Sequence, residues 1–240
     1  PRYVNNAEAI AIFLLNINGN GTAFESPAIH ANISPNLKTM PCSLNIHISH
    51  NLEGFPGSWA TVTHELFHLY QYGYAQFKNS WYLESLANWA DRAVKIDITA
   101  NTQKLPILPQ NSTELENQIF KQSYTPLWRR LFLISQQDVL IVPKSMQDRT
   151  YIGGSKVFLD HEWRGTKFVL RFMQNLEKES DKISKQRQWP QYYWKEKDQH
   201  LIEWDPIIFG LIQKQLQQPA YDQKEIQFMR KVAIEDLKGK

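Results

Sequence analysis

The sequence contains almost no cysteine: Cys42 is the only one among 240 residues. A single cysteine cannot form an intrachain disulfide, and it excludes a cysteine-rich zinc ribbon or finger. Cys42 could act as a nucleophile with one of the seven histidines, but its place after Pro41, at the start of a strand-like run, favours a packed side chain. A lone thiol suits a reducing compartment and an exported bacterial protein equally, so it does not fix the localisation.

Long hydrophobic runs are also absent. The longest run covers only residues 9–15, which is too short to span a bilayer, so no membrane insertion is expected. The chain begins at Pro1 without a basic segment followed by an apolar stretch. We therefore expect that any signal peptide has been removed or was never present.

The sequence has no strong excess of charge of either sign. The formal net charge is +3, and the basic residues between 178 and 187 alternate with acidic ones, as on a solvated helix face. Neither DNA nor RNA is expected as a partner. What the chain does have is 42% hydrophobic residues and eight tryptophans, which indicates a folded globular protein with a substantial core.

The most informative motif is His64-Glu65-Leu66-Phe67-His68. Residues four apart lie one above the other on a helix, so His64 and His68 can direct two imidazoles at one metal ion. Glu65 projects from an adjacent part of the same helix, where its carboxylate can reach a water at the metal without being a ligand. The motif therefore predicts half of a zinc site together with its general base.

A catalytic zinc usually has three protein ligands and an open fourth position, so a third ligand is expected downstream. Glu84 lies sixteen residues after His68, beyond the Gly73 that can end the first helix and within a second helical pattern over residues 81–90. Asn88, one turn later, could accept the second ring N–H of a histidine ligand. The alternative is that both histidines are ordinary helix residues and that Glu84 pairs with a nearby cation.

HExxH followed by a glutamate on the next helix resembles the gluzincin branch of the zinc metallopeptidases. More narrowly, the run from His64 to Gln71 and a later W-x-x-E-x-x-A segment, here residues 81–87, are similar to bacterial peptidase-MA-like secreted metallopeptidases. The resemblance covers about a third of the chain. It implies that His64, His68 and Glu84 bind one Zn²⁺ ion and that Glu65 is the catalytic base.

Two positions depart from the family pattern. Such families often have glycine directly after the third ligand, where this chain has Ser85, and thermolysin-like enzymes have aspartate where it has Asn88. The second departure bears on how strongly a histidine ligand is polarised. The resemblance also implies export from a bacterium.

The expected fold is α+β and zincin-like, with residues 1–240 forming one catalytic domain. Residues 1–75 would hold a small mixed sheet and the HExxH helix, and residues 76–240 would be mainly helical. Apolar runs and alternation predict strands near residues 10–17, 28–33 and 43–51 and a short extended piece at 139–142. The resemblance gives residues 43–51 the role of an edge strand that pairs with extended substrate. Residues 127–135 are expected to form a helix.

Residues 151–159 are expected to open a further helical stretch that continues through an amphipathic pattern ending near Leu176. Peptidase-MA-type families have a tyrosine in front of a comparable helix. The resemblance therefore gives Tyr151 the role of donating its hydroxyl to the developing oxyanion, with His161 as the second choice. A buried tyrosine with a satisfied hydroxyl is the alternative.

These observations predict a zinc-dependent metallopeptidase whose substrate is a protein or peptide. Two other functions are consistent with the motif: a catalytically inactive zincin-like domain that binds proteins or peptides, and a zinc hydrolase of non-peptide amide bonds. The intact Glu65 argues against the inactive domain, because nothing structural requires an acid next to a zinc ligand. No oligomeric state is predicted.

Overall fold

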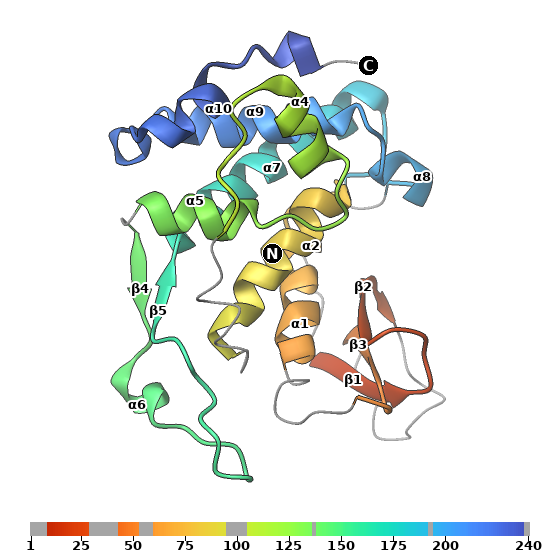
Figure 1. The fold of residues 1–240 in the computed structure, drawn as a ribbon. Helices are drawn as coiled ribbons and strands as arrows, with labels where there is room; N and C mark the ends of the chain where they lie inside the picture. Colours follow the sequence, from red (N-terminus) through yellow and green to blue (C-terminus); the bar gives the residue numbers. More distant parts are fainter. Residues whose placement is uncertain are drawn as a thin grey trace. The chain divides into compact units, whose positions relative to one another are not determined.

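The computed structural model describes residues 9–28, 43–52, 60–94, 105–135, 138–191 and 194–237 (Figure 1). Cys42 and the part of the expected second strand beyond Ala28 lie outside these ranges. The fold is mixed α+β with a small sheet, as expected. The chain divides into two compact units, one of residues 1–74, 90–98 and 144–160 and one of residues 75–89, 99–143 and 161–240.

The first unit contains a three-stranded mixed sheet of β1 (Ala9–Leu15), β2 (Gly21–Ala28) and β3 (Ser43–Ser49). The strand order is β1-β3-β2, with β1 parallel and β2 antiparallel to β3. The predictions for β1 and β3 are confirmed. β2 begins directly after the turn over residues 18–21, in which Gly19 adopts a φ of 90°, and it overlaps the strand expected over residues 28–33 only at Ala28.

β3 is the central strand of this sheet, so the expected edge-strand role for residues 43–51 is wrong. Its neighbours β1 and β2 occupy both edges. The burial pattern agrees: Leu44, Ile46 and Ile48 are buried as predicted, but Asn45 and Ser49 on the opposite face are buried as well. A strand hydrogen-bonded on both sides has no free backbone groups with which to bind an extended peptide.

Helix α1 (Ala60–Tyr72) packs against β2 and β3 in the same unit and carries the HExxH motif (Figure 1). The unit also contains the 3-10 turn η4 (Asp91–Val94), which contacts α1, and the short α6 (Lys144–Gln147). An ion-pair distance of 3.9 Å joins Arg92 of η4 to Asp160 at the end of the third segment. These contacts bring segments far apart in sequence to the motif helix.

The second unit is mainly helical. Its described elements are α2 (Ser80–Ala90, of which Ala90 belongs to the first unit), α4 (Ser112–Leu115), the π-helix η5 (Glu116–Phe120), α5 (Leu127–Ser135), the hairpin strands β4 (Val139–Ile141) and β5 (Glu162–Arg164), α7 (Thr166–Arg187), α8 (Glu196–Gln199), α9 (Trp204–Leu216), η6 (Pro219–Tyr221), η7 (Lys224–Ile226), α10 (Gln227–Lys231) and η8 (Ile234–Leu237). The predictions of α2 and α5 are confirmed, and α5 has the predicted bounds.

The core of this unit is aromatic. Trp128 and Phe132 of α5 and Phe168 and Phe172 of α7 are all buried. The ring centroids of Trp128 and Phe172 lie 5.3 Å apart and those of Phe132 and Phe168 lie 5.4 Å apart. Such ring pairs add to the stabilisation that their buried apolar area provides. They fix α5 against α7.

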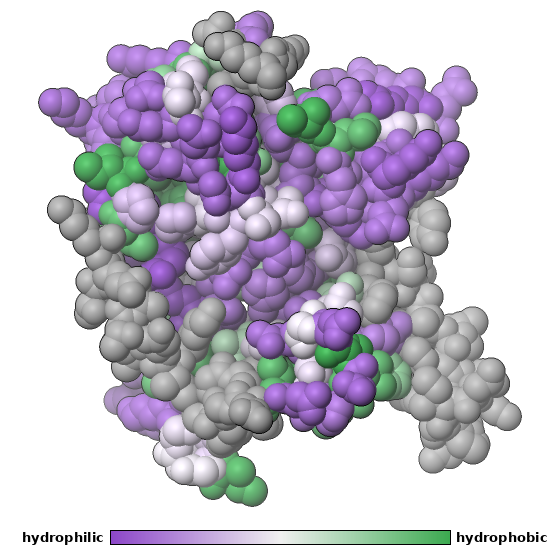
Figure 2. Space-filling model, turned by 45° about the vertical axis from the view of Figure 1, so that its right-hand side comes forward, coloured by the Kyte–Doolittle hydropathy of each residue, from purple (hydrophilic) through white to green (hydrophobic). Residues whose placement is uncertain are grey.

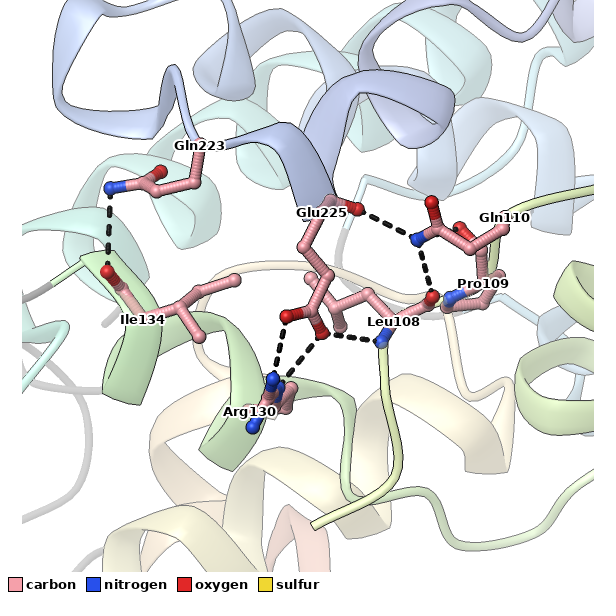
Figure 3. A network of polar contacts seen from close by, with 7 residues as sticks. All are labelled: Leu108, Pro109, Gln110, Arg130, Ile134, Gln223 and Glu225. Atoms are coloured by element: carbon pink, nitrogen blue, oxygen red, sulfur yellow. Dashed lines mark hydrogen bonds and ion pairs between the residues drawn. The ribbon is translucent and has the colours of Figure 1, made fainter.

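A polar network joins three distant segments of the second unit (Figure 3). The Arg130 guanidinium donates two hydrogen bonds to the Glu225 carboxylate, at 2.8 and 2.6 Å, and the backbone N–H of Leu108 donates to Glu225 at 2.7 Å. Nε2 of Gln110 donates to the backbone carbonyl of Glu225, and Nε2 of Gln223 donates to the backbone carbonyl of Ile134. The paired guanidinium holds the pKa of the Glu225 carboxyl below its ordinary value.

Residues 151–161 are not helical, so the predicted helix over 151–159 is wrong. They form turns closed by a bridge between Thr150 and Lys156, and the next helix begins only at Thr166. Gly154, with a φ of 83°, and Gly165, with a φ of 87°, explain the difference, because left-handed backbone interrupts a right-handed helix. The apolar spacing resembled a helix, but the glycines determine the local structure.

On the face shown in Figure 2, most residues are hydrophilic and the hydrophobic ones form small, separate groups. Among the described residues, no helix is both long enough and apolar enough to cross a membrane.

Candidate metal centre

The two histidines of α1 lie on one face of the helix and converge. Their Nε2 atoms are 3.0 Å apart, and the two rings meet edge to face. His68 is buried, and the His64 side chain is 15% exposed. One site of low solvent access therefore receives both imidazole nitrogens, as the four-residue spacing predicts.

The other ring nitrogens are already engaged. Nδ1 of His68 lies 2.8 Å from Oε1 of Gln71, one turn further along α1, and Nδ1 of His64 lies 3.8 Å from Oδ2 of Asp91. The amide oxygen of Gln71 can only accept, so its hydrogen bond favours the ring proton of His68 on Nδ1 and leaves the Nε2 lone pair of His68 directed at His64. An Nε2 lone pair directed in this way is available to a cation between the two rings.

Glu84 is the third member of this group. Nitrogen atoms of His64 and His68 and a carboxylate oxygen of Glu84 all lie within 4.8 Å of one another. With metal–ligand distances near 2.05 Å, tetrahedral zinc would place its ligand atoms about 3.3 Å apart. The histidine pair is within a few tenths of an ångström of this value. The donor set of two imidazoles and one carboxylate fits zinc.

Helix α2 presents Glu84 on its accessible side. Only Ser80, Glu84 and Asn88 on this helix are not buried, and they follow one another at four-residue spacing. The buried faces carry Trp81, Tyr82 and Leu86. Packing on three sides thus determines which way Glu84 points.

The start of α2 is held by a buried acid. Asn79 Nδ2 and Trp81 Nε1 both donate to Oδ1 of Asp205, each at 2.6 Å. Burial raises the pKa of the Asp205 carboxyl, and these two hydrogen bonds oppose the rise. The carbonyl of Asn79 also accepts from the backbone N–H groups of Tyr82 and Leu83. The first turn of the helix, directly before Glu84, is therefore fixed.

The expected partner of a histidine ligand, Asn88, has a different contact in the structure. Its Nδ2 donates to the carbonyl of Glu84, one turn earlier, at 2.8 Å. The residues that approach the histidine Nδ1 atoms are Gln71 and Asp91, whose roles the sequence reasoning missed. Asp91 follows Glu84 by seven residues, which is two helical turns, and this spacing is the signal that could have revealed it.

Glu65, the expected base, is buried at 5% exposure. Its side chain faces the start of β2: a Cβ atom built on Gly21 would lie 3.0 Å from both Cγ and Oε1 of Glu65. The Glu65 side chain therefore lies where α1 packs on β2. In sequence, Glu65 directly follows His64 on the same helix.

Tyr151 belongs to the same compact unit as α1 and lies in a turn. Its backbone N–H donates to Ser155 and its carbonyl accepts from Gly154. Burial raises the pKa of its hydroxyl. His161 lies in the second unit, where its carbonyl accepts from the N–H of Val142. The role of either residue at the site stays a prediction.

No family model, curated protein or solved structure matches the chain. The gluzincin resemblance therefore rests on the sequence motif.

Proposed function

We propose that the chain is a zinc-dependent metallopeptidase with a zincin-like, gluzincin-type architecture. The observation that carries this proposal is the convergence of His64, His68 and Glu84 on one point, with Glu65 buried on the same helix. A structural cluster of histidines would not need an acid of this kind beside it, whereas hydrolysis of a peptide bond requires a base.

His64, His68 and Glu84 would hold one Zn²⁺ ion and leave a position open. Zinc at this site would act as a Lewis acid toward the scissile carbonyl and the attacking water. Gln71 and Asp91 orient the two imidazoles through their Nδ1 atoms, which keeps Nε2 available for the metal.

Glu65 performs the proton transfers. One of its carboxylate oxygens accepts a proton from the attacking water, and the same proton then passes to the nitrogen of the leaving amine. Tyr151 would donate its hydroxyl to the oxyanion, with His161 as the second choice. The low exposure of Glu65 favours the transfers, because few competing waters solvate the carboxylate.

Extended substrate would pair with β2 rather than β3. Within the described sheet β2 is an edge strand, and it is the strand that packs closely against α1 beside Glu65. Pairing through backbone groups requires no particular side chain in the substrate, so this mode of binding suits a peptidase of broad sequence preference.

The proposal is tested by comparing the wild type with Glu65→Gln and Glu84→Ala on a peptide library, with zinc content measured for each. Glu65→Gln should retain about one zinc per chain and lose cleavage by about three orders of magnitude or more, whereas Glu84→Ala should lose both. Cleavage by the wild type should stop with a chelator and return with zinc.

Other outcomes would point to the alternatives. Tight peptide binding by the zinc-loaded wild type without cleavage would indicate an inactive zincin-like binding domain. Cleavage of small amides but of no peptide would indicate a non-peptide amide hydrolase. An active Glu65→Gln protein would overturn the assignment of the base.

A further inference from the structure

Gly21 begins β2 and lies opposite Ile48 of β3 in the antiparallel register. It differs from Gly19, Gly154 and Gly165, which have positive φ values and need glycine for their backbone conformation. Gly21 has no such φ, so its backbone conformation is open to any residue. The requirement for glycine here comes from space.

Two side chains of α1 occupy the volume that a larger residue at position 21 would need. A Cβ atom there would lie 2.9 Å from Cγ2 of Thr61 and 3.0 Å from Cγ and Oε1 of Glu65. Thr61 and Glu65 are four residues apart and share a face of the helix. Real Cβ contacts are almost never as short as the one to Thr61, and those to Glu65 are tighter than nine in ten, so Thr61 would have to shift and Glu65 would have to give by a few tenths of an ångström.

We propose that Gly21 is a positioning residue that sets the location of the Glu65 carboxylate. The missing side chain lets β2 approach α1 closely, and Cγ and Oε1 of Glu65 lie next to the place where a side chain at position 21 would begin. A methyl group at position 21 presses on Cγ of Glu65, close to the start of that side chain, and Cγ must give by a few tenths of an ångström. The catalytic consequence rests on the proposed function, whereas the contact itself does not.

The displacement should affect catalysis without affecting the metal. The imidazoles of His64 and His68 have their own partners, Asp91 and Gln71, and no atom of either ring is among the three atoms nearest to a Cβ at position 21. A base misplaced by about 1 Å can lower the rate of a proton transfer by up to a hundredfold. Binding of substrate and of zinc should change little.

The experiment compares Gly21→Ala with the wild type in the full chain. We expect kcat to fall by about tenfold or more, while KM and the zinc Kd stay within about twofold. Thr22→Ala is the matched control, since Thr22 is the next residue of β2 and is exposed. Thr61→Ser removes the nearest methyl group, so the double variant Gly21→Ala/Thr61→Ser should recover part of the lost kcat.

A thermal-unfolding cycle tests the contact without any assay of activity. Gly21→Ala should lower the Tm of the wild type by several degrees. In a Glu65→Ala background the same substitution should lower the Tm by less, because only the contact with Thr61 then remains. The measured quantity is the difference between the Tm losses in the two backgrounds, which reports the coupling between positions 21 and 65.

The outcomes separate the inference from the proposed function. Coupling in the unfolding cycle together with a zinc-loaded wild type that cleaves nothing would overturn the peptidase and leave Gly21 as the residue that positions Glu65. Equal Tm losses in the two backgrounds, or an unchanged kcat in Gly21→Ala, would overturn the role of Gly21 whether or not the protein is a peptidase.

Discussion

At the scale of single residues, the two imidazoles of the site differ in the groups that orient them. His68 is held by Gln71 of its own helix through a short hydrogen bond, whereas His64 depends on the carboxylate of Asp91 at 3.8 Å. A carboxylate behind a histidine ligand raises the basicity of the ring and fixes its proton on the far nitrogen. Asp91 is buried, so its charge acts on His64 with little screening by solvent.

Asp91→Ala should therefore weaken zinc binding by about 10- to 100-fold. Asn88→Ala is the control: Asn88 lies between Glu84 and Asp91 in sequence, but its side chain bonds to the helix backbone. Its removal should change the zinc Kd by less than about threefold. Competition with a chromophoric chelator measures both constants. A similar loss in the two variants would show that the orientation of His64 does not depend on Asp91.

The grouping of His64, His68 and Glu84 could be predicted from sequence because it depends on spacing along two helices. Four residues separate His64 and His68 on one helix, and Glu84 follows in a second helix that its apolar spacing defines. Gln71 and Asp91 could not be assigned in the same way. Their roles depend on side-chain orientation, and the structure gives Asn88, the predicted partner, a bond to the carbonyl of Glu84 instead.

At the scale of elements, long periodic segments were predictable and sheet order was not. The apolar spacing of residues 127–135 predicts α5 exactly where it lies, because its buried face faces an aromatic core. The alternation of residues 43–49 predicts β3 but contains no information on its neighbours, so its central position was missed. The prediction of a helix over 151–159 was wrong because Gly154 has a left-handed backbone. Gly165, also left-handed, lies directly before the start of α7.

Gly165 is also confined by its surroundings, which leads to a prediction about α7. A Cβ atom at this position would lie 2.4 Å from the buried ring of Phe132. Gly165→Ala adds this clash to the strain of a positive φ and should cost about 3 kcal/mol or more of unfolding free energy. Chemical denaturation monitored by tryptophan fluorescence measures the loss.

Gly154→Ala provides the matched control for this substitution. Gly154 has nearly the same φ, 83° against 87°, but a Cβ atom there would meet nothing within 4 Å. The control should therefore lose only the cost of backbone strain, about 1 kcal/mol. Equal losses in the two variants would mean that Phe132 yields to the added methyl group and that packing against α5 does not confine the start of α7.

At the scale of the whole molecule, the network around Glu225 ties segments that are far apart in the chain. Glu225 accepts from Leu108 and from Arg130 of α5, so one carboxylate joins residues separated by more than a hundred positions. Bonds of this range stabilise the folded state of the second unit cooperatively, because no local structure can form them alone. The side chains of Arg130 and Glu225 are only 22% and 18% exposed, so water screens the attraction between their charges less than on an open surface.

The network predicts how stability depends on pH. The Glu225 pKa is lower in the folded chain than its ordinary value, mainly because Arg130 donates to the charged form. The unfolded state therefore binds the proton more readily, so the stability that Glu225 contributes is fully present above its ordinary pKa and is lost as the pH falls through the lowered one. Glu225→Gln should reduce the Tm by a few degrees at pH 7, and the difference from the wild type should shrink steadily below about pH 4.

Glu203→Gln serves as the control, because its pair with Arg187 is more exposed, at 46% and 39%, and should contribute little at any pH. Thermal unfolding of the three proteins from pH 3 to 7 decides the matter: a difference between Glu225→Gln and the wild type that does not change with pH would show that packing, and not the charge of the carboxylate, holds these segments together.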